Sequence, residues 1–362
     1  MSGLILSMSI EPELSRLRAE IDSCDDRILD VLNQRARLAM EVGRLKHANA
    51  SPVFRPDREA EIIRRLGERS SGPLKADAIE RIYVEVLSAC RALERPIRVG
   101  YLGPAGTFTH EAARRRFGAC AEYVPCTTFE DVFRETERRA VDYGVVGIEN
   151  STAGSVTSTL DALMESKLQV CAEIELPIRQ HLLSYGDLAQ IRRVHSHPQA
   201  LAQCRRWLSE HLPHAELIEE SSTAHAVKMA VDPVVAAIGP ETAGEIYGVP
   251  SIAADIADSG TNITRFLVVG QERSGRTGRD KSAVVFSMKD RSGALADTLV
   301  TFARNGINLT RIESRPSRRR VWEYDFFVEF NGHPEDENVA TALKELDLQC
   351  YFVKTLGAWP IA

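Results

Sequence analysis

Residues 11–47 carry an apolar stripe whose members recur every three or four positions, the spacing of one helical face. An uninterrupted helix over these residues would be about 55 Å long at 1.5 Å per residue. Few helices of globular proteins are that long, and the stripe must be covered by other helices or by a second chain. The stripe consists of Leu14, Leu17, Ile21, Ile28, Val31, Leu38, Val42 and Leu45.

Two more helices are expected before residue 96. Pro52 and Pro56 interrupt the first pattern, and "RPDREAEIIRRL" restarts it with proline and acidic residues in the first turn. A third helix runs from about residue 75 to residue 94. Three helices, one of them very long, make a poor monomeric core in a segment this short. We therefore expect this segment to dimerise.

After Pro96 the period of the pattern changes. Short β-rich runs alternate with helical stretches at 109–117, 129–140, 198–211 and 223–231, which predicts an α/β sheet in two lobes with a cleft between them. The β-rich runs are "IRVGYLG", "YGVVGIEN", "LQVCAEIEL", "VVAAIG" and "RFLVVG".

A polar, glycine-containing linker, "QERSGRTGRDK", is expected at 271–281. The order of elements beyond it is βαββαβ, which is ferredoxin-like. The chain is thus expected to be multidomain, with an all-helical domain at 8–95, a two-lobed α/β domain at 97–271 and a ferredoxin-like domain at 281–362. The last domain's expected elements are strand 282–288, helix 293–304, strands 306–313 and 321–330, helix 335–346 and strand 349–356.

Composition excludes several classes of protein. A formal charge of −6 and a pI near 5.9 argue against a broad nucleic-acid surface. No apolar run approaches the roughly 18 residues of a membrane span. The seven cysteines are scattered without a CxxC pair, so we expect reduced thiols in a cytoplasmic protein. His195 and His197 lack a carboxylate or cysteine at metal-ligand spacing, so no metal is expected.

One position of the helical stripe carries an arginine. Arg35 occupies the slot after Val31, and Lys46, eleven residues on, lies within about 20° of it on the same face. A buried arginine that sets the register, with a lysine reaching out to solvent, is one interpretation. Arg18 and Arg58 suggest another, a cationic pocket between helices that suits a small polyanion.

The helical segment resembles a known family through "LRAEIDSCDDRILDVLNQRARLAMEVGRLK", "RPDRE" and "ALE". These motifs are similar to the all-helical chorismate mutase domain that precedes prephenate dehydratase in bifunctional enzymes, where it is an intertwined dimer. The resemblance implies that cationic side chains grip the two carboxylates and the ether oxygen of chorismate. The implied residues are Arg18 (reaching the partner's site), Arg35, Lys46, Arg58 and Glu59.

Three positions of the implied chorismate site depart from the enteric pattern. Arg55 stands where an Asp is found, Cys90 where a Ser is found, and Glu94 where a Gln donates to the ether oxygen. An ionised carboxylate cannot donate a hydrogen bond. Our hypothesis is that Glu94 acts in its protonated form, which a desolvated pocket favours and nearby cations oppose.

In the α/β segment, polar motifs follow several of the expected strands, where ligands bind in open α/β sheets. "GPAGTFTHEAA", "GIENSTAGSV", "HSHPQA", "ESSTAHA" and "TNITRF" resemble the motifs of prephenate dehydratase. The resemblance implies that Thr264 hydrogen-bonds the leaving hydroxyl. The proton donor stays open between Thr264, Glu149 and His197. The residues implied to bind carboxylates and the keto group are Thr107, Asn150, Ser151, Gln199, Ser222, Thr223 and Arg265.

The C-terminal segment resembles a phenylalanine-binding ACT domain through "GALADTL" and "RIESRP". The resemblance implies that backbone groups near Gly293, Ala294 and Leu295 bind the charged head of the amino acid. It also implies that Glu313, Ser314 and Arg315 form an interface that closes over the ligand.

The expected function is a bifunctional enzyme that converts chorismate to prephenate and then to phenylpyruvate, without a cofactor, and is inhibited by phenylalanine. A homodimer or homotetramer is expected, with no nucleic acid or membrane as a partner. A dehydratase whose helical domain has decayed to a dimerisation module, and a ligand-sensing binding protein, are the alternatives. The absence of a dinucleotide fingerprint argues against a prephenate dehydrogenase.

Overall fold

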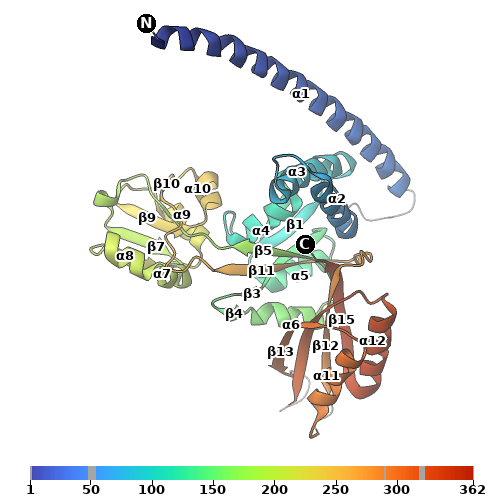
Figure 1. The fold of residues 1–362 in the computed structure, drawn as a ribbon. Coiled ribbons are helices and arrows are strands. Elements are labelled where there is room, and N and C mark those ends of the chain that lie inside the picture. Colours follow the sequence, from blue (N-terminus) through green and yellow to red (C-terminus); the bar gives the residue numbers. More distant parts are fainter. Residues whose placement is uncertain (1, 48–53, 289–290, 318–322, 362) are drawn as a thin grey trace.

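The computed structural model describes residues 2–47, 54–288, 291–317 and 323–361, and of residues 2–10 and 46–47 it describes the helical backbone alone. The N-terminal part consists of α1 (Ser2–His47), α2 (Pro56–Arg69) and α3 (Ala76–Glu94). Figure 1 shows α1 extending far from the rest of the molecule. The predicted long helix is confirmed, and its stripe is open to solvent: Ile21 is 59% exposed and Val31 62%.

The predicted α/β architecture is confirmed and consists of two sheets. The ten-stranded sheet has the order β13-β14-β12-β15-β5-β11-β3-β1-β2, with β4 paired to β3. Its strands from the α/β segment are β1 (Arg98–Leu102), β2 (Glu122–Cys126), β3 (Tyr143–Asn150), β4 (Gly154–Ser155), β5 (Gln169–Pro177) and β11 (Ile263–Gly270). The helices that cover this part are α4 (Phe108–Phe117), α5 (Phe129–Glu137) and α6 (Thr157–Glu165).

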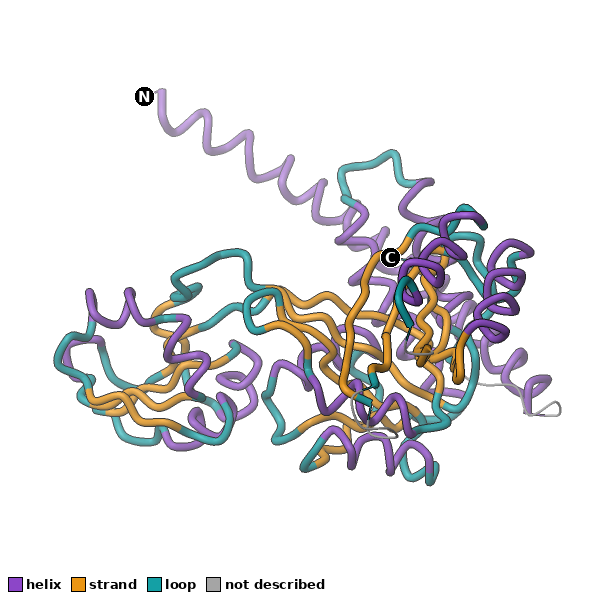
Figure 2. The backbone as a smooth tube through the Cα atoms, turned by 90° about the horizontal axis from the view of Figure 1, so that it is seen from below, coloured by secondary structure: helices purple, strands orange, loops and turns teal. Residues whose placement is uncertain are grey.

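The five-stranded sheet has the order β10-β6-β9-β7-β8 and forms a second lobe. Figure 2 shows this lobe set apart from the ten-stranded sheet. The chain enters the lobe after β5 and leaves it before β11. Its strands are β6 (His181–Leu183), β7 (Arg193–Ser196), β8 (Glu216–Glu219), β9 (Val235–Gly239) and β10 (Ser251–Ala253). Its helices are α7 (Pro198–Gln203), α8 (Arg205–His211), α9 (Thr223–Met229) and α10 (Glu241–Tyr247), with a 3-10 turn at Leu188–Gln190.

The C-terminal segment has the predicted βαββαβ order. Its elements are β12 (Asp280–Met288), α11 (Ala294–Arg304), β13 (Leu309–Pro316), β14 (Tyr324–Asn331), α12 (Glu337–Gln349) and β15 (Cys350–Pro360). Strand β15 joins the two parts of the large sheet through a parallel pair, Gly357 with Val170 of β5. A Cβ on Gly357 would lie 2.1 Å from the Val170 carbonyl oxygen, so only glycine permits this joint.

Two apolar cores hold the N-terminal and C-terminal segments against the large sheet. Phe54 from the N-terminal segment is buried with Phe117 and Tyr143 beneath α4, so the helical segment is anchored on one face of the large sheet. Trp359 and Leu356 of β15 pack among α5 and α6 residues on another core of that sheet. The three segments are therefore packed against one another and not merely linked.

Candidate active sites

A cavity of about 1050 Å³ lies between the N-terminal helices and extends down to β5 and the C-terminal residues. Arg35, Leu38 and Val42 line it from α1, while Cys90 and Glu94 line it from α3. These residues come together because α1 packs against α3. The cavity thus unites six positions of the implied chorismate site: Arg35, Arg55, Arg58, Glu59, Cys90 and Glu94.

Arg35 leaves the apolar seam of α1 by pointing across to α3. Its Nη1 donates to Cys90 Sγ at 2.8 Å, and Cys90 is buried. A guanidinium has five N–H donors, so this contact leaves further donors for a ligand. The arginine in the stripe is therefore an inward-facing cation, and Cys90 holds its orientation.

Glu94 packs tightly against α1. A Cβ on Gly43 would lie 2.7 Å from Glu94 Cγ, so the glycine in the middle of the long helix makes room for this side chain. Glu94 Oε2 is buried and has no hydrogen-bond partner among the described residues. A buried, unpartnered carboxyl oxygen at a cavity wall is placed to interact with a ligand.

The cations at the start of α2 already have carboxylate partners. Arg55 pairs with Asp57 at 2.6 Å and Arg58 with Glu61 at 2.5 Å, both near the surface. Burial works against the ionised form of Asp57, but Arg55 outweighs it and lowers the pKa of Asp57 below its ordinary value. Each arginine keeps further N–H donors, but its charge is already partly balanced by a carboxylate.

Glu59 binds Arg91, a residue that the sequence analysis missed. The two side chains form a buried ion pair, and Arg91 Nη2 also donates to the Phe117 carbonyl oxygen at 2.8 Å. A sequence signal existed, because Arg91 lies four residues after Leu87 and so shares the apolar face of α3. The pair ties α2 and α3 to α4.

Two of the implied residues are not in the described cavity lining. Arg18 is exposed on α1, and its seventeen-residue separation from Arg35 corresponds to about 25 Å along the helix. The side chain of Lys46 lies outside the described residues. The cavity of a single chain is therefore lined by only part of the implied set.

In the α/β segment, Thr264 and Asn150 face each other on paired strands. Thr264 of β11 pairs in register with Asn150 of β3, and Asn150 Nδ2 donates to Thr264 Oγ1 at 2.8 Å. Asn150 Oδ1 accepts from Thr152 N, Thr152 Oγ1 and Ala153 N, which fixes the orientation of the amide. Ser151 Oγ bridges to the Thr261 carbonyl oxygen at 3.1 Å.

The loop before α4 approaches the second lobe. Thr107 caps α4, and its hydroxyl donates to the Leu102 carbonyl oxygen at 2.8 Å. Tyr247 of α10 donates to the Ala105 carbonyl oxygen at 2.6 Å, and a Cβ on Gly106 would lie 2.9 Å from Ala243 Cα. Gly106 has a φ of 86°, which glycine adopts readily. Thr107 is therefore close to the junction of the lobes.

In the second lobe, the implied residues follow adjacent parallel strands. The ring of His197, directly after β7, accepts from Gln199 N at 3.3 Å, and Ser222, after β8, caps α9 ahead of Thr223. Because β7 and β8 are parallel neighbours, these groups lie at the same edge of the sheet. The sequence analysis missed Glu220 beside them, which contacts the His195 ring at 2.8 Å.

Two groups on α4 have pKa values shifted by burial. Burial, with Arg114 nearby, lowers the pKa of His110 to about 4; its ring stacks on Tyr101, with centroids 4.6 Å apart. Burial also raises the pKa of Glu111 to about 6, assisted by Glu241 and Glu245 of α10 and opposed by Arg115. Glu111 thus lies on the side of α4 that faces α10 of the second lobe.

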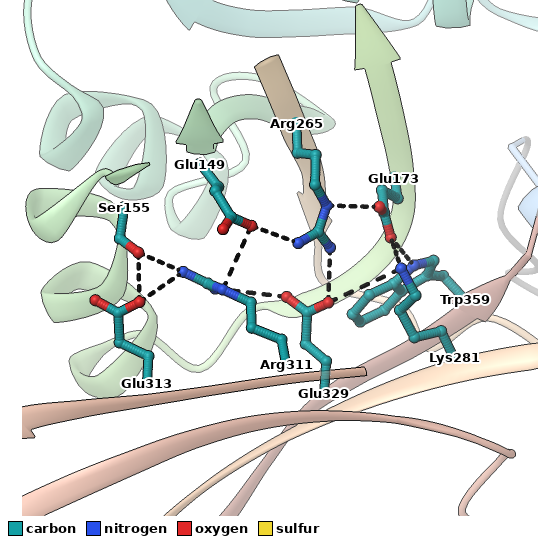
Figure 3. Close-up of polar contacts among 9 residues, drawn as sticks. All are labelled: Glu149, Ser155, Glu173, Arg265, Lys281, Arg311, Glu313, Glu329 and Trp359. Atoms are coloured by element: carbon teal, nitrogen blue, oxygen red, sulfur yellow. Dashed lines mark hydrogen bonds and ion pairs between the residues drawn. The ribbon is translucent and has the colours of Figure 1, made fainter. Parts of the chain in front are cut away.

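Arg265 and Glu149 do not join Thr264 and Asn150 on their face of the strands. Figure 3 shows Arg265 surrounded by Glu149, Glu173 and Glu329, at 2.8, 2.9 and 2.6 Å. Burial lowers the pKa of Arg265, but Glu329 and Glu173 outweigh it, and the net shift is upward. Burial likewise raises the pKa of Glu173, but Arg265 and Lys281 bring it below its ordinary value.

In the C-terminal segment, Gly293 caps α11 with a φ of 81°, and nothing lies within 4 Å of the position of a Cβ there. The first turn, with Ala294 and Leu295, follows it directly. Glu313 binds Ser155, while Arg315 contacts Asp161 of α6 at 2.9 Å. Ser314 pairs with Phe326 across β13 and β14, and β13 is the edge strand of its sheet.

In the described part of the chain, no group of three or more His, Cys, Asp or Glu side chains could hold a metal ion. Within the same residues, no helix is both long and apolar enough to cross a membrane.

Comparisons with known proteins cover all three segments. Residues 17–95 match the family model of type II chorismate mutase, residues 99–274 that of prephenate dehydratase and residues 282–348 that of the ACT domain. A solved structure of prephenate dehydratase in complex with L-Phe from Arthrobacter aurescens is 36% identical, with a TM-score of 0.68 over 74% of this chain and 90% of that chain.

Two curated proteins match over almost their whole length, and both are named bifunctional chorismate mutase/prephenate dehydratase. The protein of Aquifex aeolicus (strain VF5) is 46% identical over 97% of this chain and 98% of its own. The protein of Neisseria gonorrhoeae (strain ATCC 700825 / FA 1090) is 43% identical over 99% of both chains. With its helical, α/β and ACT segments in the same order, the chain belongs to the family of bifunctional chorismate mutase/prephenate dehydratases.

Proposed function

We propose that the N-terminal helices rearrange chorismate to prephenate and that the α/β domain converts prephenate to phenylpyruvate. The first reaction is pericyclic and forms no covalent intermediate with the protein. The site must therefore hold a compact conformer of a dianion and stabilise the charge that develops on its ether oxygen. The observation that supports this most directly is the cavity on which Arg35, Arg58 and Glu94 converge.

In the mutase site, Arg35 would bind a substrate carboxylate. Its contact with Cys90 fixes the guanidinium before the ligand arrives. Arg58 and Arg55 line the same cavity and would contribute further cationic contacts. Glu94 would donate to the ether oxygen in its protonated form, because only that form carries a proton on the carboxyl group.

In the dehydratase reaction, prephenate loses carbon dioxide and its ring hydroxyl, which leaves as water once it has received a proton. Thr264 Oγ1 accepts from Asn150 Nδ2, so the hydroxyl proton of Thr264 must point elsewhere. Among the described residues, no group accepts a hydrogen bond from this hydroxyl. It is thus available to hydrogen-bond the leaving hydroxyl, which supports the role proposed for Thr264. Thr107, Ser151, His197, Gln199, Ser222 and Thr223 would bind the remaining polar groups.

Thr264→Ala should lower dehydratase turnover by about a hundredfold or more, because the leaving hydroxyl loses its hydrogen-bond donor. Thr264→Ser should retain most of the activity, since it keeps the hydroxyl. Steady-state kinetics with prephenate measure both variants. Circular dichroism and thermal unfolding of each preparation report whether the fold is intact. Full dehydratase turnover in Thr264→Ala would refute the assignment.

We also propose that phenylalanine regulates the enzyme through the ACT domain. The related Arthrobacter aurescens enzyme was solved with L-Phe, and the open space at Gly293 would admit an amino acid at the start of α11. Glu313 and Arg315 contact the dehydratase domain. A ligand that shifts β13 would therefore change these contacts and the conformation of the dehydratase domain. All seven cysteines are free, which supports a cytoplasmic location.

The proposed function is tested by supplying the purified protein with chorismate alone, with and without phenylalanine. Phenylpyruvate should appear, and less of it when phenylalanine is present. If chorismate stays intact while added prephenate is consumed, the helical domain is a scaffold only. If neither compound is consumed, the chain acts as a binding protein.

A further inference from the structure

We propose that Glu329 and Arg311 of the ACT domain are positioning residues of the dehydratase reaction, because they hold Arg265, the residue next to Thr264. The proposal rests on the proposed function of Thr264. It assigns Arg265 and Glu149 to the support of the site and not to contact with prephenate. The evidence is a closed ring of ion pairs between the two domains.

The ring consists of two arginines that alternate with two glutamates (Figure 3). Arg265 contacts Glu149 at 2.8 Å and Glu329 at 2.6 Å, and Arg311 contacts the same two carboxylates at 3.5 Å each. The side chain of Glu329 is 7% exposed, that of Arg311 10% and that of Arg265 17%. The Glu149 side chain is 33% exposed, so water reaches the ring from the Glu149 side only in part, and each carboxylate is shared by both guanidiniums.

The guanidinium of Arg265 has few N–H donors left for a substrate. Its Nη1, Nη2 and Nε contact Glu149, Glu329 and Glu173 respectively. Glu173 is in turn held by Lys281 Nζ and Trp359 Nε1, each at 2.8 Å. All three nitrogens of Arg265 are therefore engaged with protein carboxylates.

The ring acts on the catalytic face because of strand geometry. Thr264 with Asn150 and Arg265 with Glu149 are consecutive cross-strand pairs of β11 and β3, so they lie on opposite faces of the sheet. The register of the same two strands shifts between Arg265 and Phe266. Backbone pairing is thus irregular directly after Arg265, and the ring holds the two strands together at that point.

The other half of the ring belongs to β13 and β14, where Arg311 and Glu329 are also paired in register. Arg311 Nη2 contacts Glu313 at 3.1 Å and Ser155 of β4 at 2.8 Å, and Ser155 pairs with Glu149. A ligand that displaces β13 would pull on this half and loosen the clamp. The ring therefore gives the coupling between the ACT domain and Thr264 a defined physical form.

Glu329→Gln tests the proposal, with Glu335→Gln as the matched control, because the Glu335 side chain is 73% exposed in the same domain. Glu329→Gln should lower the dehydratase kcat about tenfold or more, because a small misplacement of a catalytic group has a large effect on rate. The KM for prephenate should stay within about twofold, because ground-state binding is not removed. Inhibition by phenylalanine should weaken although calorimetry still detects its binding, and Glu335→Gln should behave like the wild type.

Circular dichroism and thermal unfolding of the same preparations, together with the mutase rate, distinguish misfolding from loss of positioning. If Glu329→Gln loses both activities, Arg311→Lys takes its place, since it keeps the charge and loses the planar fork; its kcat should fall and its KM should not change. An unchanged kcat, or a raised KM with kcat preserved, would overturn the proposal. A wild type that leaves prephenate intact would refute the proposed function itself, and the ring proposal with it.

Discussion

At the scale of single residues, the neighbours of a charged side chain determine whether it is free to bind a ligand. Arg35 and Arg265 were both predicted as ligand-binding cations. Arg35 faces a cavity with one recorded contact, whereas Arg265 is enclosed by three carboxylates. For both arginines, the prediction rested on the residue type and on the motif that contains it. Their environments differ because one side chain borders an open volume and the other a domain interface.

Glu94→Gln should make the mutase rate independent of pH. An amide donates a hydrogen bond at any pH, whereas the glutamate donates only when protonated. The wild-type rate should therefore fall as pH rises over about pH 5 to 8. Mutase rates of the wild type and Glu94→Gln over this range test the prediction, and Glu68→Gln, at an exposed position, is the control. A flat wild-type profile would contradict the role of Glu94.

Glu111 should make the protein less stable as the pH rises through about 6. Burial raises the pKa of Glu111 from 4.5 to about 6 in the folded protein. Between these values the folded state binds more protons than the unfolded state, so the stabilising contribution is complete below pH 4.5 and lost above pH 6.

Glu111→Gln should therefore raise the free energy of unfolding at pH 8 by up to about 2 kcal/mol, with little change at acid pH. Urea denaturation at both pH values measures this difference. Glu122→Gln, at a carboxylate that is 58% exposed, provides the matched control. An equal effect of both substitutions at pH 8 would exclude burial as the cause.

At the scale of elements, the joint between β15 and β5 connects the ACT domain to the dehydratase sheet. Gly357 lies there with a φ of 150°, and the Val170 backbone occupies the place of a side chain. The βαββαβ order was predicted from the sequence, but this joint was not. A glycine within a strand pattern indicates close approach of some backbone without identifying which one.

Gly357→Ala should lower the free energy of unfolding by roughly 3 kcal/mol or more, through backbone strain and a clash with β5. Gly278→Ala is the control, because Gly278 also has a positive φ but nothing within 4 Å of its Cβ position. That variant should lose only about 1–2 kcal/mol. Chemical denaturation compares the two, and equal losses would show that the close approach to Val170 carries no energy.

At the scale of the whole molecule, α1 leaves a row of large apolar side chains in water. Ile28 is 56% exposed and Leu45 is 70% exposed. A second copy of the chain would cover this face, and Arg18 would then lie near the cavity of the partner. The intertwined dimer that the resemblance implies would account for both the exposed apolar face of α1 and the position of Arg18.

Ile28→Glu should reduce the molar mass of the assembly in light scattering and abolish most mutase activity, because a charge in an apolar seam opposes burial. Dehydratase activity should persist, since its residues lie in a separate domain. Arg27→Glu, on the neighbouring helical position, should leave the assembly intact. An unchanged mass and mutase rate in Ile28→Glu would count against association through α1.

The sequence by itself determined the order of helices and strands, the three kinds of segment and the motifs at the strand ends. These follow from local periodicity and from short-range turn and capping chemistry, which the chain encodes within a few residues. Thr264 and Asn150 belong to this part, because each lies at a recognisable strand end.

Only the tertiary structure decided which partners the charged groups have. Arg91 meets Glu59, Glu94 packs on Gly43, and Arg265 joins Glu329, which lies 64 positions further along the chain. Such contacts depend on how distant segments pack, and no local pattern specifies them. For that reason the sequence predicts which residue types belong to the sites, while the fold shows which of these side chains line a cavity and which contact another domain.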